Sequence, residues 1–253
     1  MPAEVKILLQ GFTNADSVEE TGEERMQPTV TLVKDGDFVI VCDPGVMRSQ
    51  DMLIEALAKE GLAVKDVNVV FISHSHIDHF RNIGLFPDAK VLDFYGIWHE
   101  DTVDEWEENF SPNIKILHTP GHDYTSITLF ANTENGVVAV CGDVFWKENY
   151  PRDPKNDAFA SNPDRLKDSR EQVVKMADWI VPGHGPMYKN GRSIDKDSVD
   201  VVKEKEPKIV VMCKKCDTAM KQKDKCQCRP YLCFRCCECC FDCDTCSCSH
   251  RKK

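Results

Sequence analysis

Three imidazoles and one carboxylate stand within six residues of this chain, directly after an apolar segment. The six residues are His74-Ser75-His76-Ile77-Asp78-His79, and the segment before them, residues 67–73, is typical of a buried strand. In an extended chain His74 and His76 point to the same side, whereas Asp78 and His79 follow where the chain must turn. Imidazole and carboxylate together suit zinc, or alternatively iron or manganese. We therefore expect a metal site at the end of this strand.

Four ligands cannot complete the coordination shells of two metal ions, and three later motifs offer more. Gly121-His122, Gly142-Asp143 and Gly183-His184 each follow a predicted strand, and each glycine lets the backbone approach closely. The candidate metal ligands are His74, His76, Asp78, His79, His122, Asp143 and His184. Their order predicts two groups of three, with Asp143 between the groups and one bridging position left for water. Two ions that share a water lower its pKa toward neutrality, which is the chemistry of metal-dependent hydrolases.

Strand and helix patterns are mixed throughout the first 190 residues. Two pairs of strands are predicted to form hairpins, residues 29–33 with 38–42 around Asp35-Gly36, and residues 127–131 with 136–141. Single strands are expected at residues 5–12, 67–73, 91–95, 114–117 and 179–181, and a loop at residues 14–27. Helices are expected at residues 51–60 and 162–177. The pattern indicates a chain of the α/β or α+β class.

The composition divides the chain into an acidic body and a basic tail. Residues 1–202 carry 19 Lys and Arg against 35 Asp and Glu, a net charge of −16, whereas residues 203–253 carry 13 against 7, a net charge of +6. Twelve of the 14 cysteines lie between Cys213 and Cys248. We predict a hydrolase domain at residues 1–190, a linker at 191–208 and a cysteine-rich tail at 209–253. A body this acidic attracts polyphosphate only where metal ions or a local basic patch intervene.

The cysteine spacing of the tail favours metal over disulfides in a reducing compartment. No stretch approaches 18 consecutive apolar residues and the first residues do not read as a secretory signal, so an intracellular protein without a transmembrane segment is expected. Cys213-x-x-Cys216, Cys233-x-x-Cys236 and Cys243-x-x-Cys246 have the spacing of zinc ligands. The tail is predicted to bind additional zinc, a protein partner or an anionic surface.

The order His-x-His-x-Asp-His, Gly-His, Gly-Asp and Pro-Gly-His resembles the metallo-β-lactamase superfamily over about residues 5–190, and Asp43-Pro44-Gly45 stands where that family has its Asp-x-Gly turn. The resemblance implies an α+β fold, a four-layer αββα sandwich, here followed by a cysteine-rich C-terminal tail. It also implies two Zn²⁺ ions, with iron or manganese as alternatives. By this resemblance the first metal is bound by His74, His76 and His122, the second by Asp78, His79 and His184, and both by Asp143.

Three stretches resemble one branch of the superfamily, the metallo-β-lactamase domain-containing protein 1 group. They are residues 79–87, Gly142-Asp143-Val144-Phe145, and residues 181–186. This resemblance implies a homodimeric endoribonuclease of the cytoplasm and nucleus, acting on RNA of the histone pre-messenger 3′-end type. Asp78 and Asp143 are the expected catalytic residues. The cysteine-rich tail lies outside this resemblance.

Two other functions fit the same motifs. One is a thioesterase of the hydroxyacylglutathione hydrolase kind, although those relatives carry a helical C-terminal domain where this chain is rich in cysteine. The other is a metal-binding protein without enzymatic activity, for which seven retained ligands are more than the role requires. Weaker accessory candidates are His118 as a proton donor, Tyr124 and Ser126 as cleft residues, and Arg152 and Lys155 as phosphate contacts.

Overall fold

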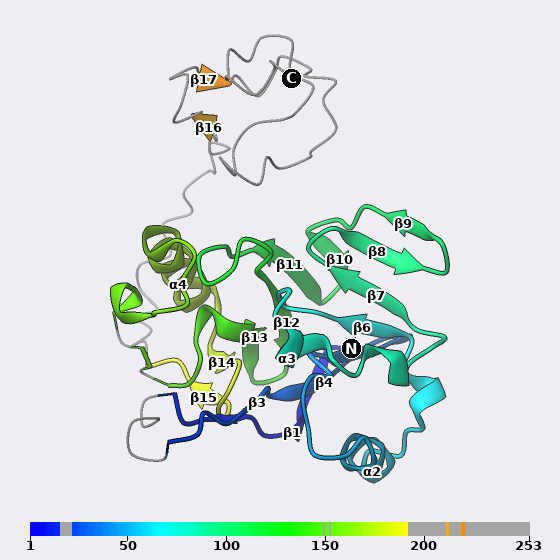
Figure 1. Ribbon diagram of the computed structural model, residues 1–253. Coiled ribbons are helices and arrows are strands. Elements are labelled where there is room, and N and C mark those ends of the chain that lie inside the picture. Colours follow the sequence, from blue (N-terminus) through cyan, green and yellow to red (C-terminus); the bar gives the residue numbers. More distant parts are fainter. Residues whose placement is uncertain (16–21, 149, 152, 192–210, 213–218, 221–253) are drawn as a thin grey trace, which may run out of the picture. The chain divides into compact units, whose positions relative to one another are not determined.

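The computed structural model describes residues 1–15, 22–148, 150–151, 153–191, 211–212 and 219–220 (Figure 1). The chain divides into two compact units, residues 1–193 and 194–253. In the second unit the short strands β16 (Val211–Met212) and β17 (Ala219–Met220) pair antiparallel. The rest of the predicted cysteine-rich tail, and the predicted linker beyond Gly191, lie outside the described residues. Within the described part of the chain, no helix has the length and apolarity needed to cross a membrane.

The first sheet has seven strands in the order β1-β4-β5-β6-β7-β8-β9. Its strands are β1 (Glu4–Leu9), β4 (Val30–Asp35), β5 (Phe38–Cys42), β6 (Val69–Phe71), β7 (Lys90–Asp93), β8 (Gly96–His99) and β9 (Thr102–Asp104). The predicted Asp-Gly hairpin is confirmed, with β4 and β5 paired antiparallel and Asp35 opposite Phe38. β5, β6 and β7 run parallel to one another. Parallel neighbours bring their carboxyl ends to the same sheet edge.

The second sheet has six strands in the order β10-β11-β12-β13-β14-β15. Its strands are β10 (Asn109–Ser111), β11 (Ile114–His118), β12 (Ile127–Thr133), β13 (Gly136–Val140), β14 (Trp179–Val181) and β15 (Tyr188–Lys189). The second predicted hairpin, β12 with β13, is also confirmed. β13 and β14 are parallel, with Val140 opposite Val181. A separate ribbon pairs β2 (Phe12–Thr13) with β3 (Met26–Gln27).

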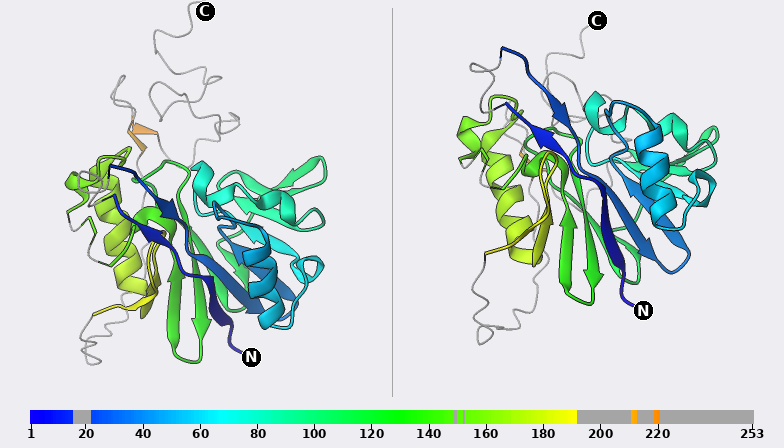
Figure 2. Two further views of the ribbon diagram at one scale, coloured as in Figure 1. Left: turned by 60° about the horizontal axis from the view of Figure 1, so that its bottom comes forward. Right: turned by 90° about the horizontal axis from the view of Figure 1, so that it is seen from below.

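The central strands of both sheets are covered on both faces, which explains their nearly continuous apolar sequences, whereas β8 and β9 are largely exposed. Side chains of the two sheets, among them Phe71 and Leu129, form one core between them. Helix α2 (Asp51–Lys59) packs on the outer face of the first sheet through Leu53 and Leu57, and α4 (Pro163–Met176) packs on the outer face of the second. Figure 2 shows these two helices on opposite sides of the paired sheets. The expected mixed α and β metallo-β-lactamase architecture is confirmed in these layers.

The sequence-based elements differ from the structure mainly at their ends and at short strands. Residues 14–27 were expected to be a loop, but Met26 and Gln27 form β3. The strands β8, β9, β10 and β15, each of two to four residues, and the one-turn helix α3 (Ile77–Phe80) are not predicted from the sequence. The remaining helical turns are the 3₁₀ segments η1 (Val64–Asp66), η2 (Ile83–Leu85), η3 (Gly142–Val144) and η4 (Pro154–Asn156). Segments this short have no periodicity to detect, because tertiary contacts select them.

A matched pair of substitutions on α2 tests the packing of this helix. Leu57 is fully buried against the first sheet, whereas Ile54 on the same helix is 40% exposed. We expect Leu57→Ala to lower the free energy of unfolding by about 2–5 kcal/mol, because it leaves a cavity. Ile54→Ala should change it by about 0.5 kcal/mol or less. Urea unfolding of both variants measures the difference, and equal losses would contradict this packing of α2.

Candidate metal centre

On the first sheet, the candidate centre lies at the ends of the parallel strands β5 and β6. β5 ends at Cys42 and is followed by Asp43, while β6 ends at Phe71 and is followed by Ser73 and His74. The Asp43 carboxylate accepts hydrogen bonds from the Ser73 N–H (2.8 Å) and the Ser73 hydroxyl (2.7 Å). This contact fixes the chain where it leaves β6. The two strand ends therefore form one rigid corner beneath the histidine cluster.

Three strands of the second sheet end at the same place. β11, β13 and β14 are followed by His122, Asp143 and His184, respectively. These strands share a direction, because β11 and β13 both pair antiparallel with β12 and β14 is parallel to β13. The Ile127 N–H at the start of β12 donates to the Ser73 carbonyl oxygen (2.8 Å), which joins the second sheet to the corner on the first. The ligands from both sheets thus meet at one edge of the sandwich.

Helix α3 carries the remaining ligands across this edge. His76 is the residue before its first turn, Asp78 lies in that turn, and His79 follows in the helix. The Val46 N–H donates to the Asp78 carbonyl oxygen (2.7 Å). A Cβ at Gly45 would overlap that carbonyl group, so the turn after Asp43 must contain glycine here. The Asp-Pro-Gly turn thus packs directly against the backbone of α3.

The seven predicted ligands form two groups within which all ligand atoms lie within 4.8 Å of one another. The first group contains His74, His76, His122 and Asp143, and the second contains Asp78, His79 and His184. His76 Nδ1 lies 3.0 Å from His74 Nε2 and 3.1 Å from His122 Nε2. His184 Nε2 lies 3.3 Å from His79 Nε2 and 3.4 Å from Asp78 Oδ2. The structure therefore brings all seven side chains together in the predicted grouping, and their role as ligands stays a prediction.

The carboxylate of Asp143 joins the two groups. Its Oδ1 lies 3.3 Å from His79 Nε2, and its Oδ2 lies 3.4 Å from both His122 Nε2 and His184 Nε2. Oδ1 is buried without a hydrogen-bond partner. A buried carboxylate oxygen without a donor is costly unless a cation neutralises it. Asp143 thus occupies the position that a bridging ligand requires.

The spacing of these atoms fits metal ions. With metal–nitrogen bonds of about 2.0–2.1 Å, two ligand atoms of a tetrahedral ion lie about 3.3–3.4 Å apart. Five pairs of ligand atoms within the two groups lie 3.0 to 3.5 Å apart. A neutral imidazole has one N–H and one nitrogen lone pair, so a hydrogen-bond network pairs each lone pair with a donor. Such a network would not direct many lone pairs to the same point. The residues present therefore fit two divalent ions.

Contacts on the outer side of the rings orient the nitrogen atoms that face inward. His79 Nδ1 lies 2.9 Å from Asp43 Oδ2, and His184 Nδ1 lies 3.1 Å from the Gln27 carbonyl oxygen. Both acceptors require Nδ1 to donate, which leaves Nε2 of each neutral ring with a lone pair directed at the other. Two such lone pairs 3.3 Å apart repel unless a proton or a metal ion lies between them.

The charges of the cluster shift its pKa values in opposite directions. Burial and the neighbouring His79 ring hold the pKa of His74 well below its ordinary value, so His74 is neutral. Burial disfavours charge on His79 as well, but the carboxylates of Asp143 and Asp43 outweigh it and raise the pKa of His79 well above the usual value. Burial likewise opposes charge on Asp143, yet His184 and His79 hold its pKa well below normal. A metal ion bound here must displace the proton that these carboxylates favour.

Residues that the sequence analysis missed surround the ligands. Asp157 Oδ2 lies 3.5 Å from His122 Nδ1, and both atoms are buried without a hydrogen bond. The Trp146 ring contacts those of His122 and His184, with centroids 5.8 and 6.2 Å apart. The sequence offers little signal for either contact, because each depends on loops that come together only in the fold. The contribution of Gln27 has no signal at all, since its acceptor is a backbone carbonyl.

The accessory candidates are only partly placed near the cluster. The His118 ring lies between Phe94 and Trp106, with centroids 5.2 and 4.8 Å away, and contacts no predicted ligand. Lys155 is exposed in η4, and Arg152 lies outside the described residues. Ser126 is buried, and its hydroxyl accepts from the Asp123 N–H in the loop that carries His122. Tyr124 is exposed in the same loop.

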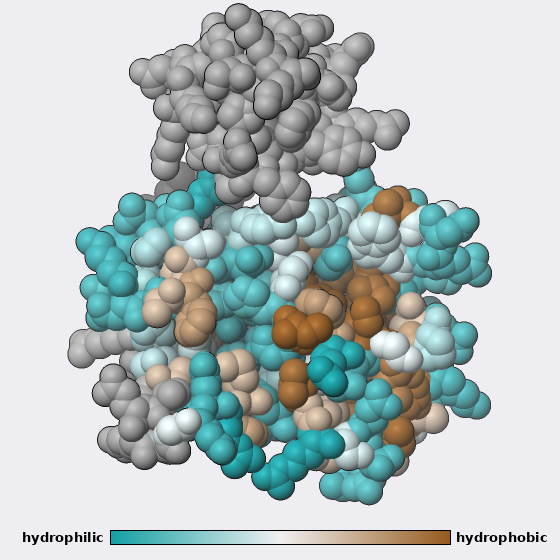
Figure 3. Space-filling view, in the orientation of Figure 1, coloured by the Kyte–Doolittle hydropathy of each residue, from teal (hydrophilic) through white to brown (hydrophobic). Residues whose placement is uncertain are grey.

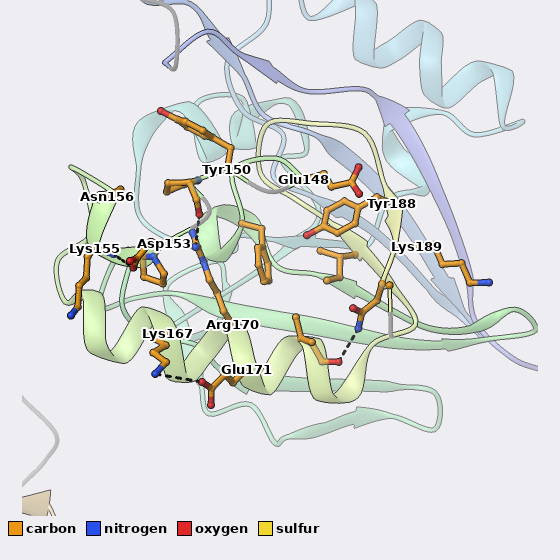
Figure 4. A pocket seen from close by; sticks show the side chains of 17 residues that line it. Glu148, Tyr150, Asp153, Lys155, Asn156, Lys167, Arg170, Glu171, Tyr188 and Lys189 are labelled. Atoms are coloured by element: carbon orange, nitrogen blue, oxygen red, sulfur yellow. Dashed lines mark hydrogen bonds and ion pairs between the residues drawn. The ribbon is translucent and has the colours of Figure 1, made fainter. Parts of the chain in front are cut away.

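Arg170 lines a hollow of about 960 Å³ beside α4 (Figure 4). Arg170 extends from α4 along its wall, and its guanidinium donates to the carbonyl oxygens of Val144 (2.7 Å) and Pro151 (2.6 Å). These carbonyls belong to the segment that follows Asp143. Arg170 therefore helps to hold the bridging carboxylate's loop against the second sheet.

Comparisons with known proteins identify the family and the fold. Residues 24–184 match the family described as the Metallo-beta-lactamase superfamily. A Xenopus laevis protein named Metallo-beta-lactamase domain-containing protein 1 is 30% identical over 202 residues, which cover 74% of this chain and 82% of that protein. Among solved structures, a putative metallo-beta-lactamase from Thermotoga maritima has a TM-score of 0.59 at 24% identity, covering 75% of this chain and 100% of its own.

A solved structure of AidC, a dizinc quorum-quenching lactonase, is also similar. Its TM-score is 0.52 at 15% sequence identity, and the match covers 67% of this chain and 77% of that one. At these identities the two solved structures establish the fold alone.

The substitution Gly183→Ala tests the close packing around Asp143. A Cβ at Gly183 would overlap Asp143 Oδ1, whereas a Cβ at Gly84 would meet no atom within 4 Å. Because the bridging carboxylate must move, we expect Gly183→Ala to weaken zinc binding at least about tenfold. Gly84→Ala should bind zinc as the unmodified protein does. Competitive chelator titration gives both affinities, and full zinc affinity in folded Gly183→Ala would argue against a bridging role for Asp143.

A second substitution tests the contact behind His122. Asp157→Asn removes the negative charge next to His122 Nδ1 and keeps the volume of the side chain. We expect zinc affinity to fall about 10–100-fold, because the carboxylate orients the ring and raises its basicity. The control is Asp168→Asn, which removes an exposed charge from α4. Equal zinc affinities for the two variants would show that Asp157 does not act on the metal centre.

Proposed function

This chain belongs to the metallo-β-lactamase superfamily, and we propose that it is a hydrolase that uses two divalent metal ions to cleave phosphodiester bonds of RNA. The observation that carries the hydrolase assignment is the position of Asp143. Its two carboxylate oxygens contact imidazoles of both ligand groups. A carboxylate shared in this way is typical of a dinuclear centre, in which two ions act on one substrate atom.

The residues would hold the ions in the grouping that the geometry gives. His74, His76 and His122 would hold the first ion, Asp78, His79 and His184 the second, and Asp143 both. This mixture of imidazole and carboxylate suits zinc, and iron or manganese are the alternatives. When bound, such ions lower the pKa of a coordinated water and neutralise negative charge that develops on the substrate.

The chain's own side chains position the water and the substrate. Asp78 is the most accessible of the two carboxylates, with its Oδ2 near His79 and His184. In the proposed reaction Asp78 would orient the attacking water and accept its proton. Asp143, buried and fixed between both groups, keeps its charge and holds the two halves of the centre together. His76 marks the open side, because its side chain is 41% exposed.

An open side favours catalysis over metal storage. A protein that only stores metal has no need for a centre reached from solvent, and structural sites are usually closed by protein ligands. Here His76 and Asp78 are the accessible members of a cluster that is otherwise buried. This difference supports an enzyme rather than the alternative of a metal-binding protein without activity.

The RNA substrate is proposed from the stretches that resemble the metallo-β-lactamase domain-containing protein 1 group. Two metals suit an in-line displacement at phosphorus, because they stabilise the attacking and the leaving oxygen together. They also supply the positive charge that the acidic body lacks. The proposal extends to RNA of the histone pre-messenger 3′-end type, to action as a homodimer in the cytoplasm and nucleus, and to a tail that binds further zinc or a partner.

A second candidate is hydrolysis of an uncharged carboxylic ester, thioester or lactone. The net charge of −16 on residues 1–202 favours it, because a neutral substrate meets no repulsion. The similar structure of a dizinc lactonase is compatible with this chemistry. A thioesterase of the hydroxyacylglutathione hydrolase kind belongs to the same class.

Asp78→Ala in the full-length, zinc-loaded protein tests the proposed activity. We expect cleavage of single-stranded RNA by the unmodified protein and a loss of about 100-fold or more in kcat/KM for the variant. Asp88→Ala, which removes an exposed carboxylate before β7, is the control and should cleave normally. Hydrolysis of S-lactoylglutathione without RNA cleavage would transfer the assignment to the second candidate. Two bound zinc ions with neither activity would refute both.

A further inference from the structure

Exposed aromatic and apolar side chains lie next to the open side of the metal centre. Ile77 is 59% exposed between His76 and Asp78, and Tyr124 is 38% exposed two residues after His122. Tyr95, which is 51% exposed after β7, contacts Tyr124. Figure 3 shows apolar residues gathered on this face over α3 and toward β7. Apolar surface beside a catalytic centre is a candidate for substrate contact.

Tyr95 and Tyr124 form a fixed pair, which we call the tyrosine platform. Their hydroxyl oxygens lie 2.9 Å apart, within hydrogen-bond distance. The Phe94 ring meets both tyrosine rings edge to face, with centroids 5.2 and 6.1 Å away, and it packs against the core between the sheets. The platform is therefore held in place before any ligand arrives, which lowers the entropy lost on binding.

The loop of Tyr124 is tied to the ligand loop at His76. Thr125 Oγ1 accepts from the Ser75 N–H (2.9 Å), and the Thr125 N–H donates to Asp123 Oδ1 (2.8 Å). Asp123 Oδ2 in turn lies 3.9 Å from His76 Nε2. These contacts keep the tyrosine platform beside the accessible edge of the first ligand group.

The charges around the tyrosine platform limit what it can bind. Burial and the hydrogen bond to Tyr124 raise the pKa of Tyr95, so the ring stays neutral. The Asp93 Oδ1 atom beside it already accepts from three N–H groups, those of Tyr95, Gly96 and Trp98. Beyond it, residues 100–108 expose six carboxylates, those of Glu100, Asp101, Asp104, Glu105, Glu107 and Glu108. These carboxylates disfavour phosphate contacts at this end of the tyrosine platform, so the platform itself is better suited to an uncharged planar ring.

We propose that the tyrosine platform stacks one nucleobase of the single-stranded RNA substrate, next to the phosphodiester at the metal centre. The inference rests on the proposed function and names how an acidic protein holds RNA. Base stacking on aromatic rings is sequence-tolerant, and removal of one ring weakens binding roughly 5- to 150-fold. Because stacking releases no counterions, this contact should add little to the salt dependence of RNA binding.

The test uses full-length, zinc-loaded protein and a short single-stranded RNA that carries 2-aminopurine, whose fluorescence is quenched when it stacks. Four variants are compared: Tyr95→Ala, Tyr124→Ala, Tyr124→Phe, and Ile54→Ala on the distant helix α2. For the two tyrosine-to-alanine variants we expect KM to rise roughly 5- to 150-fold, kcat to change little, and the quenching to be lost. Tyr124→Phe keeps the ring and should retain most of the binding, and Ile54→Ala should match the unmodified protein.

A second RNA with a single abasic position at the stacked base completes the test. The unmodified protein should bind the abasic RNA as weakly as Tyr124→Ala binds the intact RNA. For Tyr124→Ala, the abasic position should lower the affinity little further. Unchanged zinc content and unfolding midpoint in each variant confirm that the fold is intact. Equal binding of abasic and intact RNA at every position, with unchanged KM in both alanine variants, would overturn the tyrosine platform.

The outcomes separate this inference from the function on which it rests. RNA cleavage that requires Asp78 but ignores both tyrosines refutes the platform and leaves the nuclease standing. Absence of RNA cleavage by the unmodified protein refutes the nuclease and, with it, the assignment of a nucleobase. A rise in KM for an aryl thioester in the tyrosine variants, without any RNA cleavage, would assign the platform to the acyl or aryl group of the second candidate.

Discussion

The carboxylate of Asp143 is the group on which the rest of the candidate centre depends. It is a buried charge that contacts imidazoles from both sheets, and one of its oxygens has no hydrogen-bond donor. A buried charge is tolerated only when opposite charge compensates it. Two cations, one on each side, would provide that compensation and would also remove the repulsion between the inward-facing nitrogen atoms of His79 and His184. Without metal ions, protons on the surrounding imidazoles would have to provide this compensation.

The two-sheet sandwich fixes the positions of the side chains in this cluster. β5 and β6 in the first sheet, and β13 and β14 in the second, are parallel pairs whose carboxyl ends reach one edge. Glycine at positions 45 and 183 lets neighbouring backbone and carboxylate approach where any Cβ would overlap them. Outside the ligands, Asp43, the Gln27 carbonyl and Asp157 contact the outer nitrogens of the rings. Packing and the outer contacts together decide which nitrogen of each ring faces the metal position.

The charge of the surface around this centre limits the kind of substrate that can approach it. Residues 1–202 are acidic, and residues 100–108 add six exposed carboxylates near the open side of the centre. Long-range electrostatic attraction therefore does not favour the approach of a polyanion from this side. The exposed tyrosines and Ile77 offer instead short-range contacts with planar or apolar groups. For RNA and for an uncharged ester alike, substrate recognition on this face would come from ring and apolar contacts. The metal ions would neutralise the negative charge at the reacting bond. The balance between these contributions separates a nuclease from an esterase.

The sequence by itself determined the chemistry of the centre, because the spacing His-x-His-x-Asp-His and the three glycine-flanked ligands are local patterns. It also determined the two hairpins and the two long helices, whose periodicity or turn residues are encoded in adjacent positions. Only the tertiary structure decided that Asp157 meets His122, that the Gln27 carbonyl meets His184, and that Tyr95 meets Tyr124. These pairs lie 35, 157 and 29 positions apart, and the short strands β8 to β10 exist only because neighbouring strands pair with them. Contacts of this kind depend on how the sheets stack, and no local pattern of residues records that.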